Sequence, residues 1–138
     1  MRIGLMILAL LWAAPALAQQ SPPSVTLFFN FNSAQPSATG RQLVERAAAI
    51  ARQRESEGRF DHVKVIGYAD TSGSAGRSQA LSEERAAAVK RLLVASGVPE
   101  AKVTTEGRGK QELAVATADN VREPRNRRAR VVIYGPGE

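Results

Sequence analysis

Asp70 and Arg85 are the residues of this 138-residue chain whose types and positions point most directly to ligand chemistry. Asp70 follows the apolar run of residues 63–66, which predicts a buried strand, and it lies in a loop rich in Gly, Ser and Thr. At about 100° per residue, Arg85 falls within the apolar stripe of a predicted helix, between Leu92 and Val89 around the helix axis. A guanidinium in that stripe is costly unless an anion meets it.

Two interpretations of this pair are open on the residues alone. In the first, Asp70 is an ordinary turn residue, and Arg85 forms an intramolecular ion pair with Asp70 or with another acid. In the second, the two side chains flank a ligand that carries an ammonium and a carboxylate on one carbon. That arrangement is the end group of a free amino acid, so the second interpretation predicts a site for such a group.

The first 18 residues predict a cleaved secretory signal peptide. Arg2 supplies a positive charge, residues 3–12 are apolar, and Ala16-Leu17-Ala18 has the pattern of a cleavage site. The alternative is that the segment is retained as an N-terminal anchor. We therefore expect a periplasmic protein without a stable membrane span after cleavage. Three further segments are predicted, namely a linker at 19–24, a single domain at 25–134 and a C-terminal tail at 135–138.

The composition excludes several kinds of site. There is no cysteine and only one histidine, His62, which excludes a disulfide scaffold, a thiol nucleophile and a histidine-rich metal site. We therefore expect no metal and no cofactor. The formal net charge is +6, or +5 without Arg2, and such a surplus is compatible with nucleic acid. Export instead favours the anionic polymers and surfaces of the cell envelope, so no nucleic-acid partner is expected.

Strand and helix patterns alternate along the chain. Strands joined by helices require crossover connections and favour parallel pairing. The order predicts an α+β fold, β-α-β-α-β-β, with a small mixed sheet and both helices packed on one face. The predicted elements are strands at 25–31, 62–67, 102–106 and 127–134, helices at 39–57 and 78–96, and a long loop at 107–126.

Six ordered segments resemble the OmpA-like peptidoglycan-binding domain, which occurs in outer-membrane protein A, the peptidoglycan-associated lipoprotein and flagellar stator proteins. The resemblance covers Val25 to Tyr134 and implies the same OmpA-like fold. The segments are Phe28-Phe29-Asn30-Phe31-Asn32-Ser33, Gly67-Tyr68-Ala69-Asp70-Thr71-Ser72-Gly73, Leu81-Ser82-Glu83-Glu84-Arg85-Ala86-Ala87-Ala88-Val89, Gly97-Val98-Pro99, Gly107-Arg108-Gly109 and Asn126-Arg127-Arg128-Ala129.

The resemblance implies non-catalytic recognition of the peptide stem of peptidoglycan through its diaminopimelate residue. In the family, a loop aspartate and a helix arginine hold the free amine and carboxylate of that residue, and these positions correspond to Asp70 and Arg85. Arg128 is expected as a further contact to the ligand carboxylate.

Other residues around the expected site have open roles. Thr71 and Leu81 are expected either to shape the pocket, through a hydroxyl and an apolar contact, or to be structural. Asn32 replaces a frequent aspartate but keeps an acceptor for hydrogen bonding. Ser78 replaces a frequent asparagine, and its shorter side chain leaves that contact absent or taken over by water.

Two other functions compete with wall binding. A periplasmic adaptor of the same fold would bind an envelope protein instead of the wall. A wall hydrolase would use Asp70 as a base, but Ser/His/Asp chemistry would have to run through His62, which begins a predicted strand far from Asp70 in the sequence. The sequence therefore favours a binding protein over an enzyme.

Overall fold

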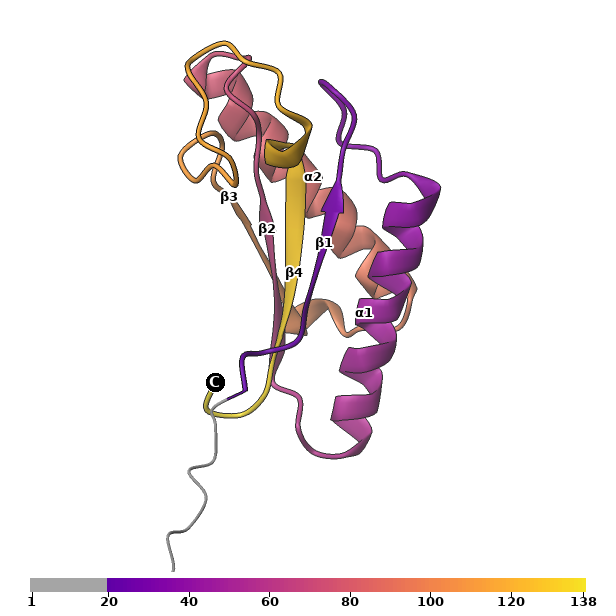
Figure 1. The fold of residues 1–138 in the computed structure, drawn as a ribbon. Coiled ribbons are helices and arrows are strands. Elements are labelled where there is room, and N and C mark those ends of the chain that lie inside the picture. The colour runs from indigo at the N-terminus through magenta and orange to yellow at the C-terminus, as the bar shows by residue number, and fades with distance from the viewer. Residues whose placement is uncertain (1–19) are drawn as a thin grey trace, which may run out of the picture.

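A computed structural model describes residues 20–138 of the chain (Figure 1). The predicted signal peptide at 1–18 lies outside the described residues and stays a prediction. No helix in the described part is both long enough and apolar enough to cross a membrane. The elements are β1 (Ser24–Phe28), α1 (Ala38–Ser56), β2 (His62–Gly67), α2 (Ala75–Ala95), β3 (Val103–Gly107) and β4 (Arg128–Tyr134), with short 3₁₀ helices η1 (Glu100–Lys102) and η2 (Pro124–Asn126).

The four strands form one mixed sheet in the order β1-β4-β2-β3. β2 and β3 pair in parallel, whereas β4 runs antiparallel to both of its neighbours, β1 and β2. The predicted α+β class and the mixed sheet are therefore confirmed. The expectation of parallel pairing between helix-linked strands holds for β2 and β3. It is wrong for β1 and β2, because β4 lies between them and pairs antiparallel with both.

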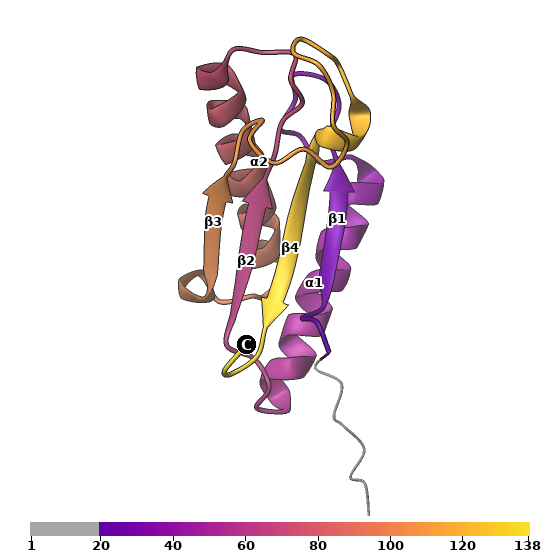
Figure 2. The ribbon, with the colours of Figure 1, turned by 60° about the vertical axis from the view of Figure 1, so that its left-hand side comes forward.

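Both helices cover one face of the sheet, as predicted (Figure 2). Along the central strands, alternate side chains point toward the helices and are completely buried, because successive residues of a strand face opposite sides. In β2 these are Val63 and Val65, and in β4 they are Ala129, Val131 and Ile133. Val44 of α1 and Val89 of α2 meet them from the helical layer.

Two element boundaries differ from the prediction by three residues, each for a local reason, and the others differ by one residue at most. β1 ends at Phe28 rather than Phe31, because the chain turns at Asn32, which has a φ of 54°. α2 begins at Ala75 rather than Ser78, because the Ser74 side chain caps the helix by accepting a hydrogen bond from the Arg77 backbone N–H at 3.1 Å. β4 begins at Arg128, one residue later than predicted.

Helix α2 lies unusually close to the sheet at two facing glycines. Gly67 and Gly107 are register partners at the ends of β2 and β3. A Cβ atom on Gly67 would lie 1.9 Å from the carbonyl oxygen of Ser82, and one on Gly107 would lie 2.7 Å from the Ser82 hydroxyl. Only glycine permits this approach, so these two residues set the depth at which α2 presents its side chains beside the Asp70 loop.

The two ends of the sheet differ in what they carry. β1 starts and β4 finishes at one end, where Ser24 pairs with Val132 and His62 pairs with Tyr134. At the opposite end, three loops gather beyond the strands, namely 29–37, 68–74 and 108–127 (Figure 1). Asp70 belongs to the second of these loops. The candidate site therefore lies at the end of the sheet opposite Ser24, where β1 begins.

Candidate functional site

Arg85 is a fully buried cation that holds the loops together. It is 0% exposed, and its guanidinium donates hydrogen bonds to the carbonyl oxygens of Tyr68 at 2.8 Å, Ser33 at 2.9 Å and Asn30 at 3.3 Å. The guanidinium also lies 5.2 Å from the ring centroid of Phe29. Burial lowers the pKa of Arg85 to about 10, and the charge of Asp70 opposes this shift, so the side chain stays cationic at neutral pH.

Asp70 is a buried carboxylate whose two oxygens have different surroundings. Oδ1 accepts hydrogen bonds from the backbone N–H of Ser72 at 3.0 Å and from the Ser72 hydroxyl. This local turn is the structural role that the sequence left open for Asp70. Oδ2 lies 3.4 Å from Nη1 of Arg127. Within residues 20–138, the ion pair of Asp70 is thus formed with Arg127 and not with Arg85.

One cavity brings most of the expected site residues together. Its volume is about 220 Å³, and it lies between the Asp70 loop, the 29–37 loop and the first turns of α2. Three arginines and one aspartate line it, so it is cationic and suited to a ligand with at least one carboxylate. The lining residues are Phe31, Asn32, Ala69, Asp70, Ser72, Gly73, Arg77, Ser78, Leu81, Arg85 and Arg127.

Asn32 and Leu81 lie in this cavity with different surroundings. The side-chain oxygen of Asn32 accepts a hydrogen bond from Nη2 of Arg77 at 2.9 Å, and its expected role toward a ligand stays a prediction. Leu81 supplies an apolar wall from α2 and is 8% exposed.

Thr71 lies next to Asp70 but outside the cavity lining. Its hydroxyl accepts from the backbone N–H of Val121 at 3.0 Å and lies 2.7 Å from the carbonyl oxygen of Ala118. Its own carbonyl oxygen accepts from the backbone N–H of Asn120 at 2.9 Å. Thr71 therefore fastens the long 108–127 loop to the Asp70 loop.

Arg128 is also placed away from the cavity. Its guanidinium lies 3.7 Å from the ring centroid of Tyr68, and its Nη2 donates to the carbonyl oxygen of Glu112 at 3.3 Å. Both contacts are on the side of the sheet opposite the helices, because Arg128 has the opposite strand parity to Ala129.

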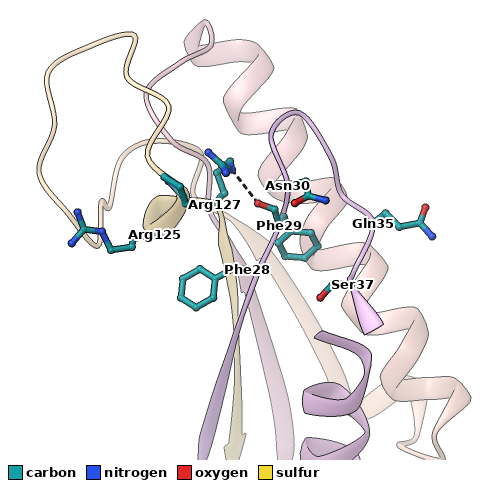
Figure 3. A pocket seen from close by; sticks show the side chains of 8 residues that line it. Phe28, Phe29, Asn30, Gln35, Ser37, Arg125 and Arg127 are labelled. Carbon is teal, nitrogen blue, oxygen red and sulfur yellow. Dashed lines mark hydrogen bonds between the residues drawn. The ribbon is translucent and has the colours of Figure 1, made fainter. Parts of the chain in front are cut away.

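Arg127 is one of two arginines in the cavity lining that the sequence interpretation missed. Its Nη1 approaches Asp70, and its Nε donates to the carbonyl oxygen of Phe29 at 3.0 Å (Figure 3). It thereby links β1, the Asp70 loop and the start of β4. Strand parity could have found it, since Arg127 shares its parity with Ala129, Val131 and Ile133, which are buried beneath the helices. Arg77, on the first turn of α2, was missed as well because the predicted helix began after it.

The described residues contain no group of three or more His, Cys, Asp or Glu side chains arranged to hold a metal ion. His62 lies at the start of β2, where it is stacked on Tyr134 with 4.7 Å between the ring centroids, and Asp70 lies beyond the other end of the same strand. The arrangement can therefore bind and orient a charged ligand, but it does not place His62 beside Asp70.

An α+β domain with a small cationic cavity among its loops, and with a buried carboxylate in that cavity, has the features of a ligand-binding domain. A profile of the OmpA family matches residues 28–127 of this sequence. The chain belongs to the OmpA family. This result confirms the resemblance that the sequence motifs indicated.

The curated relatives are outer membrane proteins of Gram-negative bacteria. Outer membrane protein A of Bordetella avium is 33% identical over 108 residues, which cover 78% of this chain and 54% of that protein. Outer membrane protein A of Serratia marcescens is 29% identical over 110 residues, covering 80% of this chain and 30% of that protein. The chain thus spans about half, or less, of the length of these relatives.

Solved structures share the fold over most of the chain. The peptidoglycan-associated lipoprotein from Burkholderia pseudomallei superposes with a TM-score of 0.69 at 27% identity, covering 78% of this chain and 88% of that one. The cell wall anchor of the T6SS from Pseudomonas aeruginosa gives a TM-score of 0.63 at 26% identity, covering 81% and 80% of the two chains.

Proposed function

We propose that this domain binds peptidoglycan without catalysis, through the diaminopimelate residue of the peptide stem, in the periplasm. The observation that carries the proposal is the shared cavity, in which the buried carboxylate of Asp70 and the guanidinium of Arg85 both take part. Two of the similar structures are described as a peptidoglycan-associated lipoprotein and a cell wall anchor, which supports a wall ligand.

In the proposed complex, Oδ2 of Asp70 accepts hydrogen bonds from the ligand ammonium. Its contact with Arg127 is 3.4 Å long, whereas a charge-assisted hydrogen bond is shorter, at about 2.7–2.9 Å. Oδ2 therefore retains acceptor capacity, and a cation at this position would share the carboxylate with Arg127. Oδ1 keeps its turn contacts with Ser72, so binding does not require the loop to unfold.

Arg85 and Arg127 supply the donors for the ligand carboxylate. A guanidinium has five N–H donors, and three nitrogens of Arg85 each make one bond to a backbone carbonyl oxygen. One N–H on each terminal nitrogen is left for a carboxylate. Arg127 adds a second cation to the lining of the cavity, with a side-chain exposure of 13%.

A single stem is expected to bind only modestly. A hydrogen bond to a charged group contributes about 1.5–3 kcal/mol, and two or three of them must also offset the entropy lost on association. Retention on the wall would come from the density of stems, because rebinding to a neighbouring stem is fast on a polymer.

Co-sedimentation with purified wall sacculi tests the proposal. Asp70→Asn keeps an oxygen for the Ser72 turn but removes the charge, so we expect it to abolish co-sedimentation. Asp61→Asn, at the other end of β2, is the matched control because it changes the net charge equally on an exposed side chain. If Asp70→Asn sediments like the control, the assigned site is wrong.

Wall chemistry tests the ligand. Wall in which lysine replaces diaminopimelate lacks the side-chain carboxylate, so binding is expected to fall. Equal binding to both walls, with steep loss at high salt, would instead indicate nonspecific attraction by the basic surface. A protein partner that is still captured from envelope extracts after wall digestion would favour the adaptor function, and fragments released from sacculi would indicate a hydrolase.

A further inference from the structure

Arg77 is the third arginine in the lining of the candidate cavity, and the proposed function leaves it without a role. Its side chain is 47% exposed, whereas Arg85 is fully buried. Its Nη2 donates to the Asn32 side chain at 2.9 Å, and its Nη1 lies 3.8 Å from a carboxylate oxygen of Glu84. A guanidinium has five N–H donors, and one of these makes a hydrogen bond within the described residues. Arg77 therefore has donors left for a ligand.

The charges that line the cavity are unbalanced. The guanidinium groups of Arg77, Arg85 and Arg127 are matched by one carboxylate, that of Asp70. Burial lowers the pKa of Arg85, and the like charges of Arg127 and Arg77 add to this decrease, so the cations act on one another. The end group of an amino acid carries one positive and one negative charge, and its binding leaves the excess of cations unchanged. A ligand with a second carboxylate would reduce that excess.

Arg77, Leu81 and Arg85 form a row along α2. They are four residues apart, so they are neighbours on one face of the helix, and all three line the cavity. Both guanidinium groups donate to the same loop, 29–37, so they converge on it from different turns of α2. The cavity thus has two cations along one wall, with the apolar side chain of Leu81 between them.

We propose that Arg77 binds the second carboxylate of diaminopimelate, at the end through which this residue is joined to the stem. Diaminopimelate has an amino-acid group at each end and three methylene groups between them. Its two carboxylate carbons are six carbon–carbon bonds apart, or about 7.5 Å when extended. Eight residues of helix rise about 12 Å, so a ligand of this length spans most of the row and the arginine side chains cover the rest. With the free end held at Asp70, the methylene chain lies against Leu81.

This inference rests on the proposed function and adds a preference among stems. The second carboxylate is free where a stem ends at diaminopimelate. In a longer stem it forms an amide bond, which carries no negative charge for Arg77 and makes a weaker hydrogen bond. The glutamate before diaminopimelate has a carboxylate in both kinds of stem, so it does not produce the preference. The domain should therefore prefer stems that end at diaminopimelate.

Calorimetry with two soluble probes tests the inference. One probe is the stem tripeptide that ends at diaminopimelate, and the other is the same tripeptide with its second diaminopimelate carboxylate converted to an amide. We expect the unmodified tripeptide to bind about tenfold more tightly, which corresponds to about 1.4 kcal/mol. Arg77→Gln should reduce this ratio to about one and leave the affinity for the amide unchanged. Arg59→Gln is the matched control, because Arg59 is an exposed arginine at the other end of the sheet, and it should keep the ratio.

A third probe, amidated at the glutamate instead, should bind like the unmodified tripeptide. If it loses affinity in a way that depends on Arg77, the carboxylate is wrongly assigned. If the diaminopimelate amide binds as tightly as the tripeptide, or if the ratio survives Arg77→Gln, the role of Arg77 is refuted and the proposed function stands. If no probe binds the wild-type domain, both proposals are refuted.

Discussion

Replacement of Arg85 is expected to destabilise the domain more than replacement of Asp70, although both residues are assigned to the same ligand. In Arg85→Met, the carbonyl oxygens of Ser33 and Tyr68 lose their guanidinium donor, whereas that of Asn30 still accepts from the Ser33 N–H at 3.2 Å. A buried acceptor left without a donor costs about 1–3 kcal/mol. Two of them give a loss of about 4 kcal/mol, which is a large part of a typical stability of about 5–15 kcal/mol.

Asp70→Asn removes less. The Ser72 contacts persist on the amide oxygen, whereas the charge that faces Arg127 at 3.4 Å and acts on Arg85 is lost. Breaking a well-paired buried ion pair costs about 3–5 kcal/mol, and because the contact with Arg127 is long, we expect a cost of about 2 kcal/mol. Urea denaturation followed by circular dichroism measures both values, with an unchanged m-value as evidence of a common unfolding transition. If Arg85→Met costs no more than Asp70→Asn, the three carbonyl contacts do not stabilise the fold. If the difference is as large as expected, loss of wall binding in Arg85 variants is not diagnostic, and Asp70→Asn is the decisive binding variant.

Three further predictions concern the framework of the site. Gly67→Ala should lower the free energy of unfolding in urea by about 1–3 kcal/mol, because its Cβ would lie 1.9 Å from the Ser82 carbonyl oxygen. Gly76→Ala, where a Cβ meets nothing within 4 Å, is the control and should be neutral or stabilising. Equal effects of the two changes would contradict the close approach of α2 to the sheet. Thr71→Val should speed hydrogen exchange at the Val121 amide, which loses its acceptor; unchanged exchange would refute the fastening role. Side-chain hydrogen bonds with Arg108 and Lys64 lower the pKa of Glu106 to about 2, so its contribution is present above about pH 4.5 and is lost as the pH falls toward 2. Because Glu106 is 39% exposed, the effect should be small and weakened by salt. Glu106→Gln should flatten the plot of unfolding free energy against pH below about pH 4.5. An unaltered plot would show that these ion pairs contribute nothing.

The elements of the fold were predictable because their signals are local. β2 was predicted with its observed bounds, and α1 with bounds one residue away at each end, since each has a clear apolar period and a clear stop signal. The end of β1 was not predictable from composition. Residues 28–31 keep the aromatic content of a strand, and only the left-handed turn at Asn32 diverts the chain. The insertion of β4 between β1 and β2 depends on contacts remote in sequence, which no local pattern encodes.

The site was predictable in part. An arginine in an apolar stripe correctly indicated a buried cation, but the sequence could not show that its partners are backbone carbonyl oxygens, because every residue carries one. An ion pair between Asp70 and Arg85 was one of the two interpretations left open, and the ion pair of Asp70 is with Arg127 instead. That choice depends on a single position of strand parity, which separates Arg127 on the helix side from Arg128 on the opposite side.

The direction of the strands determines at which end of the domain a neighbouring segment can be attached. Ser24 begins β1 and Tyr134 completes β4 at one end, while Asp70 lies beyond the other end of β2, whose six residues span about 20 Å. Any segment joined before β1 or after β4 is therefore attached at the end of the sheet remote from Asp70. Such a segment does not have to pass over the loops that form the candidate site. A linker attached there would therefore act as a spacer. Its length would set the distance between the attached structure and the proposed peptidoglycan ligand, and it would leave the geometry of the candidate site unchanged.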